Sequence, residues 1–101
     1  MKSLQDICEM VIDVEEGLMT GEVSFVYDGL MSAMKPGHPM EILDSILAEI
    51  FWDVQAGNEP PLEKVIHVRD QMKAFKKAFK VTKLNAAIKE MTAYIVEKGG
   101  N

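Results

Sequence analysis

The sequence predicts an all-α fold, a compact bundle of about five amphipathic helices in a single domain covering residues 1–101. Apolar residues recur at i, i+3, i+4 and i+7 in successive segments, and short turns separate these segments. The composition, 48% hydrophobic and 27% charged, is typical of a globular protein rather than a disordered chain. Burying one face of each helix gives one core, which suits a chain of this length.

The first predicted helix begins after Ser3, whose side chain can cap it, and ends near Gly21, where glycine permits a left-handed cap. One face is apolar and consists of Leu4, Ile7, Cys8, Val11, Val14 and Leu18. The opposite face carries an acidic stripe, defined as Asp6, Glu9, Asp13 and Glu16. Because Cys8 lies on the apolar face, we expect a buried, unreactive thiol.

Residues 22–35 fit two structures. The β-forming residues 23–27 are followed by Asp28 and Gly29, a pair typical of hairpin turns. Helical spacing, however, is followed without a miss by Val23, Val26, Tyr27, Leu30, Met31 and Met34. We therefore expect a second helix over residues 22–35, with a β-hairpin as the alternative.

Three further helices complete the predicted bundle. Pro39 suits the first turn of the third helix, which ends at Gly57 and has an apolar face formed by Ile42, Leu43, Ile46, Leu47, Ile50, Phe51 and Val54. The fourth runs from about residue 61 to residue 80, with Val68, Met72, Phe75 and Phe79 pointing inward. Thr82 is expected to cap the fifth, in which Leu84, Ile88, Met91 and Ile95 form a narrow seam.

Several functional classes are not expected from this composition. The single cysteine cannot form an internal disulfide, and no apolar run reaches the roughly 18 residues of a membrane span. The first residues become acidic at once and lack an apolar signal region, so we expect a cytoplasmic protein. Nucleophile elbows, glycine-rich phosphate loops and zinc-ligand spacings are absent from the sequence. We expect neither a cofactor nor a bound metal.

Charge is divided unevenly along the chain. Residues 1–63 carry thirteen acids against Lys2 and Lys35, a net −11, whereas residues 64–101 carry nine bases against three acids, a net +6. A basic stripe lies within about 120° of one helical face and consists of Arg69, Lys73, Lys76, Lys77, Lys80 and Lys83. No aromatic residue interleaves with it, and the acidic remainder would repel a polyanion, so nucleic acid is not the expected partner. The acidic and basic regions could pair within one molecule or between two.

Trp52 is the most informative single residue. Projected at about 100° per residue, it falls about 200° from the centre of the apolar face, near Ala48, Gln55 and Ala56. Tryptophan is enriched at the binding hot spots of protein interfaces. This position predicts either a partner-binding surface or a side of the helix that a neighbouring helix covers.

Carboxylates provide the one possible enzymatic feature. Glu41 and Asp44 form an E-x-x-D pair on a helix, and acids at this spacing can hold Mg²⁺. The pair is similar to part of the pattern of all-α nucleotide pyrophosphohydrolases of the MazG kind, which implies Mg²⁺-dependent hydrolysis using Glu16, Glu41 and Asp44. The E-E-x-x-E element of those enzymes is not matched, because Met19 takes the place of its last acid.

These observations favour a small acidic, non-enzymatic protein-binding module. Its predicted contact surface combines Trp52, Ala48, Gln55 and Ala56 with the acidic stripe. Residues 18–25 and 42–56 are similar to helical immunity proteins of the tRNA-cleaving colicin type, which implies an inhibitor of a basic, nucleic-acid-processing enzyme. A self-assembling structural subunit is the first alternative, and the Mg²⁺-dependent hydrolase is the second.

Overall fold

The computed structural model describes residues 2–20 and 39–100, and every regular element in them is an α-helix. The helices are α1 (Leu4–Thr20), α2 (Pro39–Gln55), α3 (Leu62–Phe79) and α4 (Leu84–Glu97). The all-α prediction is confirmed, but these residues form four helices rather than about five. The helix or β-hairpin expected over residues 22–35 lies outside the described residues.

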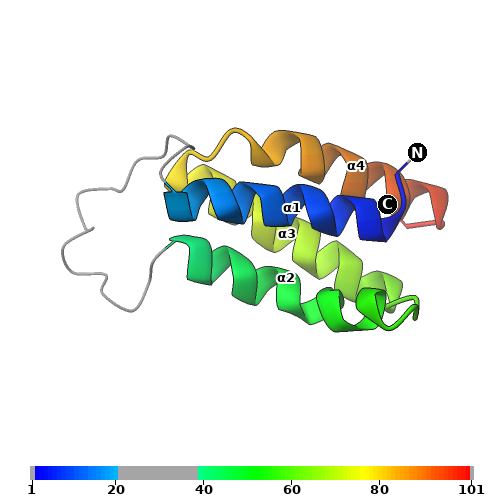
Figure 1. Ribbon diagram of the computed structural model, residues 1–101. Coiled ribbons are helices and arrows are strands. Elements are labelled where there is room, and N and C mark those ends of the chain that lie inside the picture. Colours follow the sequence, from blue (N-terminus) through cyan, green and yellow to red (C-terminus); the bar gives the residue numbers. More distant parts are fainter. Residues whose placement is uncertain (1, 21–38, 101) are drawn as a thin grey trace.

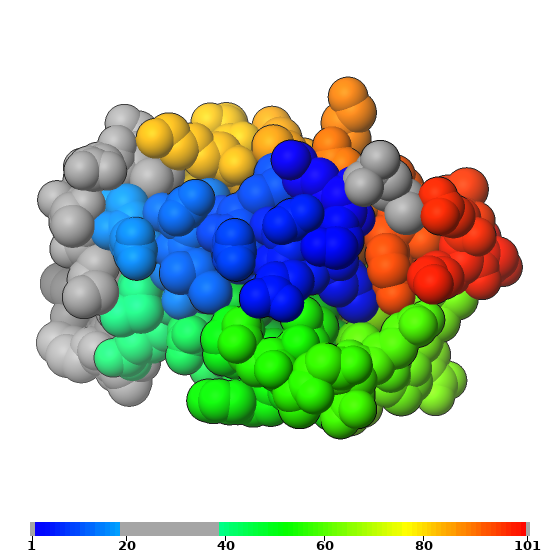
Figure 2. Space-filling view, turned by 45° about the vertical axis from the view of Figure 1, so that its right-hand side comes forward, coloured from blue at the N-terminus to red at the C-terminus, as the bar shows by residue number. Residues whose placement is uncertain are grey.

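Consecutive helices run in opposite directions, which gives an up-and-down bundle (Figure 1). The neighbours around the bundle are α1 and α2, α2 and α3, α3 and α4, and α4 and α1. In the space-filling view, α1 lies on the surface between α4 above it and α2 below it (Figure 2). Helices α1 and α3 therefore occupy opposite corners and do not contact each other, an arrangement that separates their outer faces.

A single apolar core joins the four helices. Its fully buried members include Ile7, Val11, Leu43, Leu47, Ile50, Val65, Val68, Met72, Val81, Leu84, Met91 and Ile95. All six apolar positions predicted for the first helix are buried. The inward face of α4 is broader than the predicted seam, because Ala87 and Tyr94 are buried while Ile88 is only partly so.

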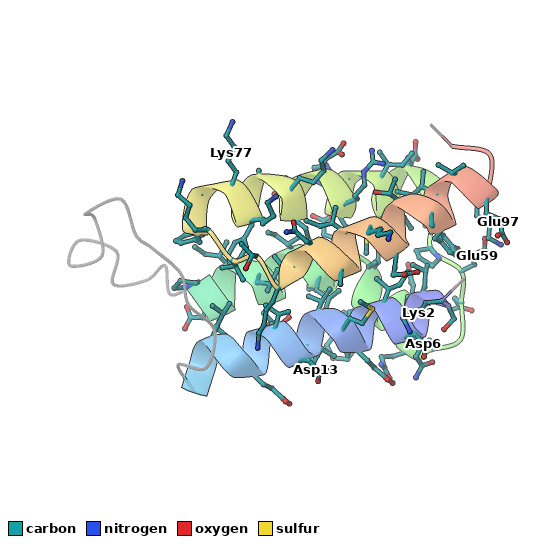
Figure 3. The ribbon with its side chains drawn as sticks, turned by 90° about the horizontal axis from the view of Figure 1, so that it is seen from above. Lys2, Asp6, Asp13, Glu59, Lys77 and Glu97 are labelled. Carbon is teal, nitrogen blue, oxygen red and sulfur yellow. The ribbon has the colours of Figure 1, made fainter. Side chains whose placement is uncertain are left out.

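The helix ends agree with most of the local signals. Ser3 Oγ accepts a hydrogen bond from the backbone N–H of Asp6 at 3.2 Å, the cap expected for α1. Pro39 begins α2, and Gly57, just beyond its end, takes the positive φ of 82° that favours glycine. Lys98 Nζ lies 3.5 Å from Glu59 Oε2, and Glu59 and Glu97 lie at the same end of the bundle (Figure 3).

The predicted cap of the last helix is wrong. The N-cap of α4 is Lys83 rather than Thr82, and no side chain caps this helix. Fully buried Val81 draws the short α3–α4 connection against the core. Backbone carbonyls then replace the side-chain cap, since Val81 and Thr82 accept hydrogen bonds from the N–H groups of Leu84 and Asn85 at 3.3 and 3.0 Å.

Candidate functional site

Trp52 lies on the outer side of α2 and is 70% exposed. The projection from sequence is confirmed, and the alternative in which a neighbouring helix covers this side is wrong. Ala48, Gln55 and Ala56 are exposed as well. The indole ring contacts Phe51 edge-on, with 5.2 Å between ring centroids and 79° between ring planes.

A hollow of about 250 Å³ lies beside Trp52, between α1 and α2. We call it the Trp52 groove; it is lined by Ile12 of α1 and by Asp44, Leu47, Ala48, Phe51 and Trp52 of α2. The walls are apolar, and the Asp44 carboxylate is the only charged side chain among them. The sequence analysis missed Ile12 and Phe51 as site residues. Ile12 could have been noticed, because it is an apolar residue outside the predicted core face of its helix.

Glu15 on α1 is a buried carboxyl that the sequence analysis did not single out. It is 8% exposed, and its Oε2 has no hydrogen-bond partner among the described residues. Burial raises the pKa of Glu15 to about 8, and the nearby Asp44 carboxylate adds to the effect, as does the charge of Glu16. The sequence contains a signal for this burial, because Glu15 is four residues after Val11 and three before Leu18, on the apolar face.

The acidic stripe is fully on the surface. Asp6, Glu9, Asp13 and Glu16 are all exposed, as predicted from the helical projection. Asp13 and Glu16 also line a hollow of about 440 Å³ together with Lys83. The prediction that Lys83 extends the basic stripe is therefore wrong: α3 ends at Phe79, and the turn after it carries Lys83 toward α1.

Four members of the basic stripe meet in a third hollow, of about 460 Å³, between α3 and α4. This lysine groove is lined by Lys73, Lys76, Lys77, Lys80, Thr82, Asn85 and Ile88. Within residues 2–20 and 39–100, none of these four lysines forms an ion pair. Arg69 is not among the lining residues and pairs instead with its neighbour Asp70, at 3.1 Å from Nε to Oδ1.

The acidic and basic faces lie on opposite sides of the molecule. Asp13 projects outward from α1, and Lys77 projects outward from α3 on the other side (Figure 3). This separation follows from the diagonal positions of α1 and α3 in the bundle. Among residues 2–20 and 39–100, no ion pair joins the acidic stripe to the basic stripe.

The carboxylates of the hydrolase alternative do not converge. Glu16 and Asp44 line different hollows, and Glu41 is exposed. Across the described part of the chain, no three His, Cys, Asp or Glu side chains gather closely enough to hold a metal ion. Cys8 is buried as predicted, and burial raises the pKa of its thiol to about 11, which keeps it protonated at neutral pH.

The helices α1 to α4 are each too short or too polar to cross a membrane. Searches of protein-family models, curated proteins and solved structures return no match to this chain.

Proposed function

We propose that this protein is a non-enzymatic binding module that contacts a basic protein through Trp52 and the Trp52 groove. Inhibition of a nucleic-acid-processing enzyme in the cytoplasm is the biological role that we propose for this contact. The observation that carries the proposal is the 70% exposure of the chain's only tryptophan beside an apolar hollow.

The energetic argument starts from the size of the indole. Covering a whole tryptophan buries roughly 150–250 Å², and the 70% of Trp52 that is exposed corresponds to roughly 105–175 Å², which at about 25 cal/mol per Å² stabilises a complex by about 3–4 kcal/mol before ordering costs. That is large enough for a hot spot. The groove beside it offers a partner side chain a place to insert, and Ala48, being small, leaves the approach to the indole open.

Charge favours a basic partner on this side of the molecule. The groove itself contains the Asp44 carboxylate, and the exposed acidic stripe lies on α1, the helix that contributes Ile12 to the groove. Exposed charges of one sign raise the rate at which an oppositely charged protein associates and repel partners of like charge. The net charge of −5 acts in the same direction.

The direct test is affinity capture from native-host lysate with the wild type, Trp52→Ala and Val96→Ala. Val96 is a matched control, because it is also a large exposed apolar residue, 57% exposed, but lies on α4. We expect a basic protein to be captured stoichiometrically by the wild type and by Val96→Ala, and to be reduced at least about tenfold by Trp52→Ala. Equal capture by Trp52→Ala, with an unchanged circular dichroism spectrum, would rule out this surface.

A second candidate, self-assembly, is favoured by the lysine groove, whose four lysines form no ion pair with the part of the chain that the structure describes. The acidic stripe on α1 and the lysine groove lie on opposite sides, so one copy could present its stripe to the groove of the next. Such head-to-tail contacts are heterologous and repeat into rings or filaments.

Self-assembly predicts a salt-dependent mass. Because exposed charge pairs are screened at high ionic strength, light scattering should show oligomers at low salt that dissociate as salt rises, with the double variant Lys73→Glu/Lys77→Glu monomeric throughout. The charge-conserving double variant Lys73→Arg/Lys77→Arg serves as the control. A wild-type monomer at every salt concentration would exclude this candidate.

A further inference from the structure

The residues that line the Trp52 groove indicate which kind of side chain it binds. Its walls are the aromatic rings of Phe51 and Trp52 with Ile12 and Leu47, and its one charge is the Asp44 carboxylate. A side chain that fits this groove has an apolar or planar stem and a cationic end. The volume of about 250 Å³ is sufficient for one such side chain and not for a folded segment.

A second carboxyl lies close to Asp44. Glu15 is 8% exposed, and its Oε2 has no hydrogen-bond partner among the described residues. Glu15 is not among the residues that line the groove. The proximity of Asp44 contributes to the raised pKa of Glu15, so a cation held at Asp44 favours the ionised form of Glu15.

We propose that the Trp52 groove binds an arginine side chain of the partner, whose guanidinium pairs with the Asp44 carboxylate. The inference rests on the proposed function for the partner, but the groove chemistry is its own evidence.

Arginine suits the groove better than lysine. The guanidinium is planar, stacks on aromatic rings and donates two parallel hydrogen bonds to a carboxylate, and it is more weakly hydrated than an ammonium. In the Trp52 groove, the aromatic rings offer a surface for stacking, and the Asp44 carboxylate accepts the hydrogen bonds. A positive charge bound at Asp44 also favours the ionised form of the nearby Glu15 carboxyl.

The other charged groups around Glu15 do not change this assignment. Glu16 is its neighbour on α1 and Asp44 faces it from α2, and both act to hold the proton on Glu15 in the free protein. From the α4 side, Lys83 lies with Asp13 and Glu16 in a different hollow. Binding of a cation at Asp44 therefore adds a positive charge close to Glu15.

The test uses N-acetyl-arginine amide as the probe, with N-acetyl-citrulline amide, its neutral isostere, as the matched ligand. The indole N–H resonance of Trp52 reports binding in NMR spectra without ambiguity, because the chain has one tryptophan. We expect a saturable shift with the arginine derivative and at least tenfold weaker binding of the citrulline derivative. Equal affinities, or no saturable shift up to about 50 mM, well above a millimolar Kd, would overturn the proposal.

The raised pKa of Glu15 gives a second readout. Wild-type affinity for the arginine probe should increase between pH 6 and pH 8, by up to about tenfold per pH unit, and level off above pH 8, because a cation at Asp44 favours ionised Glu15. Glu15→Gln should bind the probe without this pH dependence, while Glu16→Gln, a change at the exposed neighbour, should retain it. A pH dependence that is unchanged in Glu15→Gln would contradict a cation bound next to Glu15.

These measurements separate the inference from the proposed function. Failure of the arginine probe, combined with loss of partner capture in Trp52→Ala, would overturn the arginine assignment and leave the binding module in place. Binding of the probe combined with undiminished capture by Trp52→Ala would support the groove chemistry and overturn the proposed interface.

Discussion

Glu15→Gln is expected to be more stable than the wild type above pH 8, by roughly 3 kcal/mol or more, and to match it near pH 4–5. In the folded protein the pKa of Glu15 is raised to about 8, whereas in the unfolded chain it has its ordinary value near 4.5. Between these values the folded state holds a proton that the unfolded state has released. Stability therefore falls as pH rises through this interval, by up to about 1.4 kcal/mol per pH unit, and is constant above it.

Glutamine removes the titration while keeping the shape of the side chain and a donor for Asp44. The measurement is urea unfolding at a series of pH values, with the difference between variant and wild type plotted against pH. Glu16→Gln is the control, because this exposed neighbour should change stability by no more than about 0.5 kcal/mol at any pH. A difference that does not vary with pH would show that Glu15 ionises normally in the folded protein.

Ile50→Ala is expected to destabilise the fold by about 3–4 kcal/mol, whereas Trp52→Ala should cost about 1 kcal/mol or less. The two residues lie two positions apart on α2, but Ile50 is fully buried and Trp52 is 70% exposed. Alanine at position 50 loses the transfer free energy of the buried methyl and methylene groups and leaves a cavity. Alanine at position 52 loses only the edge contact with Phe51.

Chemical denaturation of both variants at one pH provides the measurement. The pair also serves as the structural control for the capture experiment, since loss of partner binding by a fully folded Trp52→Ala variant is a surface effect. Similar destabilisation by the two substitutions would mean that the indole is part of the core. The proposed interface would then have to be abandoned.

Helical periodicity predicted the core faces of individual helices well. On α1 the buried positions and the acidic stripe both follow from spacing at about 100° per residue. The outward position of Trp52 follows in the same way. Helix ends were also predictable from the sequence where a side chain or a glycine forms the cap, as at Ser3 and Gly57.

Features that depend on neighbouring segments were predicted less well. Val65 and Tyr94 extend the inward faces of α3 and α4 beyond the predicted seams, because each helix packs against two neighbours at once. The predicted cap by Thr82 is not formed, because the burial of Val81 fixes the conformation of the α3–α4 turn. The burial of Glu15 was not predicted, because a charged side chain is usually exposed even where its position lies on the apolar face of a helix.

The sequence alone determined which side of each helix faces the core, since that depends only on the spacing of apolar residues along one helix. It could not determine which helices become neighbours, because several packings bury the same faces. The tertiary structure decided that α1 and α3 stand at opposite corners, so that the acidic stripe and the lysine groove point away from each other. It also brought α1 against α2, which placed Ile12 beside Trp52 and the buried Glu15 against Asp44.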